Sequence, residues 1–176
     1  MFTPFLTLIS EVIDLRSFSN LWFWIVLAVV WTRAGNRVLG VPVDMITRAR
    51  RHEGDARRDM EDLLYIHARR AVQGAQSSGA WQVALGCFGL TALAMLGFAY
   101  GHEFSQAVLL LAVPMLAVRL LSLRLARRLL AGDERGETLD RRLAHHRTTV
   151  QLVGMLSILI TSLYGMWVNL MLGVLR

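Results

Sequence analysis

Lysine is absent from the chain, cysteine occurs once, and charged residues are scarce. Only 18% of the 176 residues are charged and 55% are hydrophobic, whereas soluble domains carry about a quarter charged residues. Together with a mean hydropathy of +0.45, this composition excludes an ordinary soluble domain. The single cysteine, Cys87, excludes a disulfide framework and a cysteine metal centre.

The positive charge comes entirely from arginine and is concentrated in two segments. The 19 arginines and 13 acids leave a formal net charge of +6. All arginines except Arg16 and Arg176 lie within residues 33–70 and 119–147, which join apolar segments. Because the basicity belongs to two loops between apolar runs, we expect no nucleic-acid partner.

Four apolar segments predict an all-α membrane protein with four transmembrane helices, because one crossing takes about 20 mostly apolar residues. We expect crossings at residues 18–39, 80–100, 104–121 and 150–175, in a single membrane domain that covers residues 1–176. The first crossing is the weakest, and Trp22, Trp24 and Trp31 are interpreted as its aromatic belts at the two membrane surfaces. Only residues 101–103 separate the second and third crossings, which predicts a tight turn.

The remaining segments predict helices outside the apolar layer. Regular apolar spacing predicts an N-terminal interfacial helix at residues 3–16. Residues 43–79 are interpreted as a cytoplasmic amphipathic arm, and residues 122–149 as a helical hairpin that extends the third and fourth crossings. The stripe of the arm is Met60, Leu63, Leu64, His67 and Ala71, and that of the hairpin is Leu139, Leu143, His146 and Val150. We expect these two extensions to pack together as a cap.

The distribution of arginine predicts the orientation, because short basic loops stay in the cytoplasm. Both arginine-rich segments join crossings on the same side of the membrane. Both termini and the turn at His102 are therefore expected on the opposite, periplasmic or lumenal, side.

No arrangement of residues predicts catalysis, a metal site or a cofactor. His102 lies at the turn opposite to His145 and His146, so these side chains cannot share a haem. His52 and His67 lack a partner at the i, i+4 spacing of helical zinc ligands. The sequence also has no phosphate-binding glycine loop, no nucleophile elbow and no acidic pair within a crossing. We therefore expect a protein that is not an enzyme.

Small and polar residues recur along the last crossing, and glycines recur along the second. Lipid provides no hydrophobic drive for helix association, so small residues that let backbones approach closely mark helix interfaces. The candidates are Gly154, Ser157, Thr161, Gly165, Asn169 and Gly173 on the last crossing, and Gly86, Gly89, Gly97 and Gly101 on the second. They are interpreted either as packing between these two crossings or as docking against another subunit.

The arginines at the cytoplasmic end of the third crossing have two interpretations. They are Arg119, Arg124, Arg127 and Arg128. One interpretation is a topology anchor in the headgroup zone, and the other is a pocket for an anionic phospholipid such as cardiolipin.

Two segments carry a resemblance to a known family. Residues 11–25 (EVIDLRSFSNLWFWI) and 38–46 (VLGVPVDMI) resemble small alphaproteobacterial membrane proteins labelled "component of SufBCD complex". This resemblance covers about the first fifty residues. It implies a multi-pass protein of a bacterial inner membrane and a link to iron-sulfur cluster assembly.

The leading functional hypothesis is a non-enzymatic accessory or assembly subunit of a larger inner-membrane complex, such as a respiratory or photosynthetic one. An alternative is a small self-associating transporter or channel in which Arg33, Thr161 and Asn169 line a path. A second alternative, implied by the resemblance, is a membrane partner of iron-sulfur cluster assembly. A redox protein with a bound cofactor ranks last.

Overall fold

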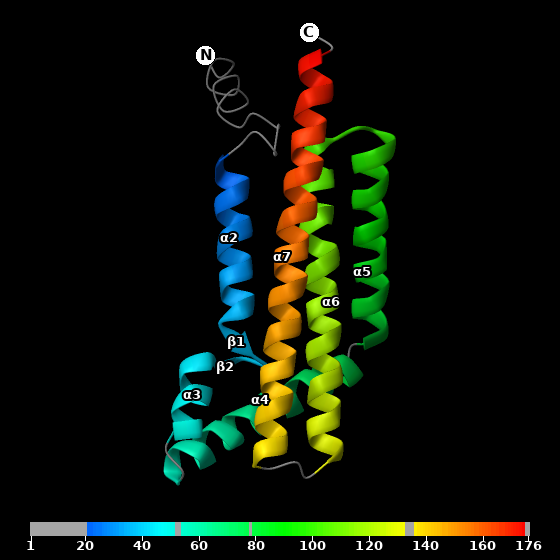
Figure 1. Ribbon diagram of the computed structural model, residues 1–176. Coiled ribbons are helices and arrows are strands. Elements are labelled where there is room, and N and C mark those ends of the chain that lie inside the picture. The colour runs from blue at the N-terminus through cyan, green and yellow to red at the C-terminus, as the bar shows by residue number, and fades with distance from the viewer. Residues whose placement is uncertain (1–20, 52–53, 78, 133–135, 175–176) are drawn as a thin grey trace, which may run out of the picture.

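Helices that run side by side make up most of the chain, and two further helices lie at one end of them (Figure 1). The computed structural model describes residues 21–51, 54–77, 79–132 and 136–174. The interfacial helix expected at residues 3–16, like His52, lies outside the described residues. The elements are α2 (Leu21–Gly35), β1 (Arg37–Val38), β2 (Val41–Pro42), α3 (Val43–Arg51), α4 (Asp55–Ser77), α5 (Gly79–Ala94), the π-helical segment η2 (Met95–Ala99), α6 (Glu103–Ala131) and α7 (Glu137–Val174).

Three of these helices are long and apolar enough to cross a membrane. They are Gly79–Ala99, which joins α5 to η2, the whole of α6, and Glu137–Met171 of α7. The fold is therefore all-helical over the described residues, apart from one two-stranded hairpin, with three candidate crossings. The fourth apolar helix, α2, has 15 residues and is shorter than a full crossing.

The four apolar helices α2, α7, α6 and α5 lie next to one another in that order (Figure 1). Each of α6 and α7 continues without a break from its apolar part into its basic part. The arginines of α3 and α4, and those of the basic parts of α6 and α7, consequently lie at the end of the bundle that α3 and α4 cover. We refer to this end, which comprises residues 37–51, 54–77, 121–131 and 137–149, as the basic end.

A β-hairpin replaces the last residues that the sequence analysis assigned to the first crossing. The helix ends at Gly35, not at residue 39, and Val38 then pairs with Val41 across a two-residue turn. Both turn residues have positive φ, 50° at Leu39 and 86° at Gly40, as a type I′ turn requires. The strands are only two residues long, which is too short for an alternation of apolar and polar residues to predict them from the sequence.

The turn between the second and third candidate crossings is tight, as the sequence predicted. Helix η2 ends at Ala99, and α6 begins at Glu103. Gly101 adopts φ 71°, which glycine tolerates at helix C-termini, and the His102 amide donates to the Leu96 carbonyl at 3.1 Å. The side-chain Nε2 of Gln106 in α6 donates to the Gly97 carbonyl at 2.7 Å, which fastens α6 to this turn.

The continuous hydrophobic core lies at the basic end and joins five elements. It contains Val38 and Val41 of the hairpin, Ile46 and Ala49 of α3, Met60 and Leu64 of α4, Leu125 and Leu129 of α6, and Leu139 and Leu143 of α7. The arm and the helical hairpin thus pack together, as expected. The stripe of α4 differs in one position, because Ala68 is buried and Ala71 is exposed.

Arginine side chains close this core on its outer side. The Arg57 guanidinium lies 3.1 Å from the Glu61 carboxylate and 3.5 Å from the Asp140 carboxylate, and it donates to the Gly136 carbonyl at 3.0 Å. Arg50 donates to the Asp140 backbone carbonyl at 2.7 Å. Two arginines of the arm therefore hold the first turn of α7 in place.

Candidate functional site

The small-residue row of α7 is buried largely inside the chain. Gly154, Ser157, Thr161 and Gly165 are all buried, and they continue the buried row that Leu139, Leu143, His146 and Val150 begin at the basic end. These residues recur every three or four positions, so they form one face of α7 along most of its length. Asn169 is exposed. Gly173 lies in α7, beyond the residues whose burial is described.

Trp31 of α2 covers the first glycine of this row. A Cβ atom at Gly154 would lie 2.7 Å from Cε3 of the Trp31 indole, and Trp31 is only 7% exposed. The sequence analysis placed Trp31 in an aromatic belt at the membrane surface. The structure corrects this assignment, because the missing side chain at Gly154 makes room for the indole between α2 and α7.

Two hydroxyl groups in the same row have no hydrogen-bond partner within the described residues. They are Ser157 Oγ and Thr161 Oγ1, and Trp31 Nε1 is also buried and unpartnered there. The contact between α2 and α7 therefore depends on close packing, because these three buried polar atoms make no hydrogen bond within the described residues.

The glycines of the second candidate crossing do not pack against α7 within the chain. Helix α6 lies between α5 and α7 (Figure 1), and the contact between the two crossings is an edge-to-face ring pair, Phe98 with Tyr164, at 6.4 Å. The expected match between the two small-residue rows is therefore not formed inside one molecule. Gly97 instead abuts Gln106, whose Cγ would lie 3.0 Å from an added Cβ.

Gly86 and Gly89 face open space. No atom lies within 4 Å of a Cβ built at either glycine, or at Gly101. On α5 they lie at helical spacing from Gln82, which accepts a hydrogen bond from Arg119 of α6 at 2.9 Å, and further along the chain Gly97 of η2 accepts one from Gln106 of α6. Contacts to α6 therefore lie before and after the two glycines in the chain. Between these contacts, α5 has a notch at which Gly86 and Gly89 carry no side chain. We call Gly86 and Gly89 the α5 notch.

The arginines of α6 separate into different environments. Arg119 is bonded to Gln82, and Arg127 is exposed. Arg124 and Arg128 line a cavity of about 470 Å³ between α6 and α7, together with Arg141, Arg142, His145 and His146 of α7. The sequence analysis did not assign the α7 residues, although their i, i+1, i+4, i+5 spacing places them on one side of a helix.

His146 links the walls of this cavity, which we call the α6–α7 cavity. Its Nε2 lies 3.2 Å from the Ser122 Oγ of α6, and its buried Nδ1 has no hydrogen-bond partner within the described residues. The side chain lies at the basic end, before the uncharged stretch that starts at Thr148. Burial, opposed by a backbone hydrogen bond and assisted by the neighbouring His145, lowers the pKa of His146 below its ordinary value.

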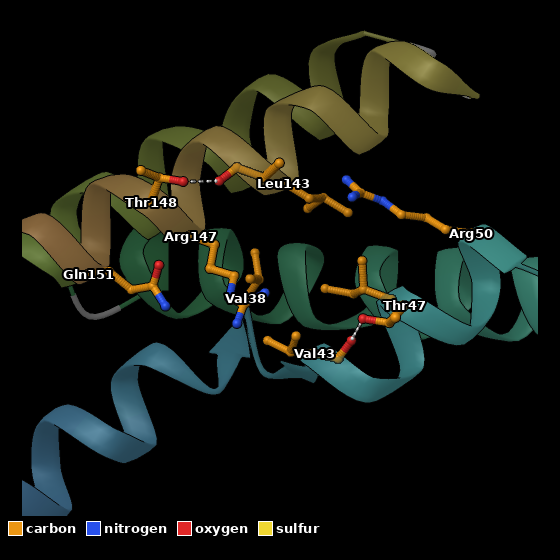
Figure 2. A pocket seen from close by; sticks show the side chains of 10 residues that line it. Val38, Val43, Thr47, Arg50, Leu143, Arg147, Thr148 and Gln151 are labelled. Atoms are coloured by element: carbon orange, nitrogen blue, oxygen red, sulfur yellow. Dashed lines mark hydrogen bonds between the residues drawn. The ribbon is translucent and has the colours of Figure 1, made fainter.

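A second, smaller cavity lies on the opposite flank of α7. It has a volume of about 150 Å³ and lies between α7 and the hairpin with α3. Figure 2 shows Arg50 and Thr47 of α3 on one side, and Arg147, Thr148 and Gln151 of α7 on the other. Two arginines line this cavity, Arg50 and Arg147, and Arg50 already donates to the Asp140 backbone carbonyl, whereas four arginines line the larger α6–α7 cavity.

The residues named for a transport path do not share a surface. Thr161 is 1% exposed, whereas Arg33 and Asn169 are exposed. None of the three lines the α6–α7 cavity or the cavity on the other flank of α7. His67 lies against the turn of the hairpin, with its Nδ1 2.9 Å from the position of a Gly40 Cβ.

Comparisons with protein-family models, with curated proteins and with solved structures found no match to the chain.

Proposed function

We propose that the protein is a multi-pass protein of a bacterial inner membrane, with α2 as a fourth crossing and both termini on the periplasmic side. The uncovered apolar surface supports a membrane location. Only 6% of the most apolar window of Gly79–Ala99 is buried inside the chain, and 11% of that of α6. Exposed apolar patches of this extent are unfavourable in water, whereas lipid solvates them. The concentration of arginine at the basic end supports the orientation.

Within that membrane, we propose that the protein is a non-enzymatic accessory or assembly subunit of a larger complex, and that a helix of another subunit packs against the α5 notch. The observation that carries this proposal is the open space in front of Gly86 and Gly89. Glycine in a helix interior costs about 1 kcal/mol relative to alanine. Inside this molecule no neighbour makes use of the missing side chains, whereas a closely approaching foreign helix would do so.

The remainder of α5 is consistent with such docking. None of the described residues of α5 is buried, and its contacts within the chain are mainly to α6, with weaker contacts to α4. The other glycines with close neighbours, Gly97 and Gly154, are already explained by Gln106 and Trp31. The notch is thus the part of the small-residue rows that the fold itself does not use.

The test is copurification from native membranes after gentle extraction. In Gly86→Leu the added Cβ meets no atom within 4 Å, so we expect the variant to fold, to reach the membrane and to lose its partner. Ala84→Leu is the matched control, because Ala84 is exposed on the opposite side of α5. Equal complex migration on a native gel for wild type, Gly86→Leu and Ala84→Leu would contradict the proposal.

The single cysteine permits a direct check of the same contact. Cys87 is exposed on α5 next to Gly86, so a photoreactive group attached to it should crosslink to the docked subunit in wild type and not in Gly86→Leu. Crosslinks that join only copies of this chain would favour the self-associating alternative.

The orientation is tested separately, because a cysteine placed at Gln76 in a Cys87→Ser background should resist impermeant thiol reagents in intact cells.

A further inference from the structure

The α6–α7 cavity has a surplus of positive charge. Four arginines from two helices line it, Arg124 and Arg128 of α6 and Arg141 and Arg142 of α7, and no acidic residue is among its lining residues. Arg141 is paired with Glu137 at 2.8 Å. Neither Arg124 nor Arg128 makes an ion pair with any residue that the structure describes.

The position of the cavity coincides with the border of the apolar layer. The lining residues nearest to the apolar parts of the two helices are Leu121 of α6 and Thr149 of α7. The uncharged run of α6 ends at Val118, and that of α7 begins at Thr148. A ligand in this cavity would therefore have its charged part beside the arginines and any apolar part beside the uncharged helices. This is the depth at which phospholipid headgroups lie.

We propose that the α6–α7 cavity binds the phosphate group of an anionic phospholipid. The planar guanidinium group forms paired hydrogen bonds with phosphate oxygens, and each of the two helices contributes two arginines to the lining of this cavity. The unpartnered His146 Nδ1 is a further buried polar atom in the wall of this cavity. The ligand thus bridges α6 to α7 beside the hydrophobic core, which shares Leu125 with this cavity.

This inference rests on the proposed membrane location and not on partner docking. The shared chemistry, a phosphate, could also come from a soluble compound. The test therefore uses the isolated full-length protein in neutral detergent and compares three probes, phosphatidylglycerol, phosphatidylcholine and glycerol 3-phosphate, by native mass spectrometry and by titration.

We expect wild type to retain phosphatidylglycerol in preference to phosphatidylcholine. Arg124→Gln combined with Arg128→Gln should weaken phosphatidylglycerol binding about twenty-five-fold, on the basis of about fivefold for each arginine near a membrane surface. The matched control is Arg69→Gln with Arg70→Gln, which removes two exposed arginines of α4 outside the cavity. This control should keep binding within about twofold of wild type.

Equal losses in both double variants would overturn the inference, because they would show a general effect of charge. Displacement of the lipid by glycerol 3-phosphate at equal concentration would refute the claim that the bound phosphate belongs to a lipid. A second measurement avoids any dependence on folding of the variants. A photoreactive phosphatidylglycerol should label wild-type residues 121–128 and 141–149, and labelling confined to other segments would refute the assignment.

Discussion

The contact between Gly154 and Trp31 provides a sharp test of how α2 is held against α7. In Gly154→Ala the new methyl carbon would lie 2.7 Å from Trp31 Cε3 and 3.2 Å from Cδ2 and Cζ3. Ordinary carbon contacts lie near 3.5–4.0 Å, so the methyl group overlaps the indole by most of an ångström. The indole is rigid and 7% exposed, so the helices must separate to accommodate the methyl group.

The expected magnitude follows from two opposing effects. Overpacking of a close contact costs about 1–3 kcal/mol, and replacing a helical glycine by alanine returns about 1 kcal/mol. Gly86→Ala is the matched control, since it gains the same propensity and meets no atom within 4 Å. We therefore expect Gly154→Ala to be less stable than Gly86→Ala by about 2 kcal/mol.

The assay is the free energy of unfolding in mixed micelles of neutral detergent and dodecyl sulfate, followed by far-ultraviolet circular dichroism. Combining Gly154→Ala with Trp31→Phe should recover part of the loss, because the smaller ring leaves room for the methyl group. Equal stability of Gly154→Ala and Gly86→Ala would refute the inferred packing of α2 on α7. The packing would also be refuted if the double variant lost more unfolding free energy than the two single variants lose together.

Two further predictions concern the basic end. Gly40→Ala should destabilise the protein by about 1–3 kcal/mol in the same assay, because it places a Cβ at φ 86° and 2.9 Å from His67 Nδ1; Gly74→Ala, with no atom within 4 Å of the added carbon, should not. Arg57→Gln should cost about 2 kcal/mol, since it leaves the partly buried Asp140 with less compensation, whereas Arg58→Gln, whose pair with Asp55 is 81% and 96% exposed, should change stability by less than about 0.5 kcal/mol.

The candidate crossings and the buried row of α7 could be predicted from the sequence because their signals are local. The long uncharged runs required helices, and the three residues around Gly101 left room only for a tight turn. The spacing of Leu139, Leu143, His146 and Val150 predicted which face of α7 is buried. Each of these inferences needs only neighbouring residues.

The contacts that define the candidate sites could not be predicted, because they depend on distant residues. Trp31 had the sequence context of a membrane-surface tryptophan, and only the proximity of Gly154 shows that it is buried. The arginines of α6 were visible as a cluster, but the cavity exists because Arg141 and Arg142 face them from another helix. The β-hairpin was missed for a different reason, because strands of two residues are too short to show an alternating pattern.

The contrast between the two ends of the bundle explains why α5 is the element most open to a partner. At the basic end, burial of apolar side chains from water drives α3, α4, α6 and α7 together around one core. Among helices surrounded by lipid that drive is absent, and association depends on close packing and hydrogen bonds.

Helix α7 has such contacts through Trp31 and Gly154, and 28% of its most apolar window is buried inside the chain. Helix α5 with η2 has 6% buried, and polar bonds fasten it to α6 near its two ends, at Gln82 and Gly97. Between those bonds the sequence has placed Gly86 and Gly89, which give up side-chain contacts with α6 and shorten the approach distance for any other helix. The two hydrogen bonds to α6 thus hold α5 in position, but the α5 notch between them has no packing partner among the described residues. A subunit that packs into the α5 notch would supply that packing.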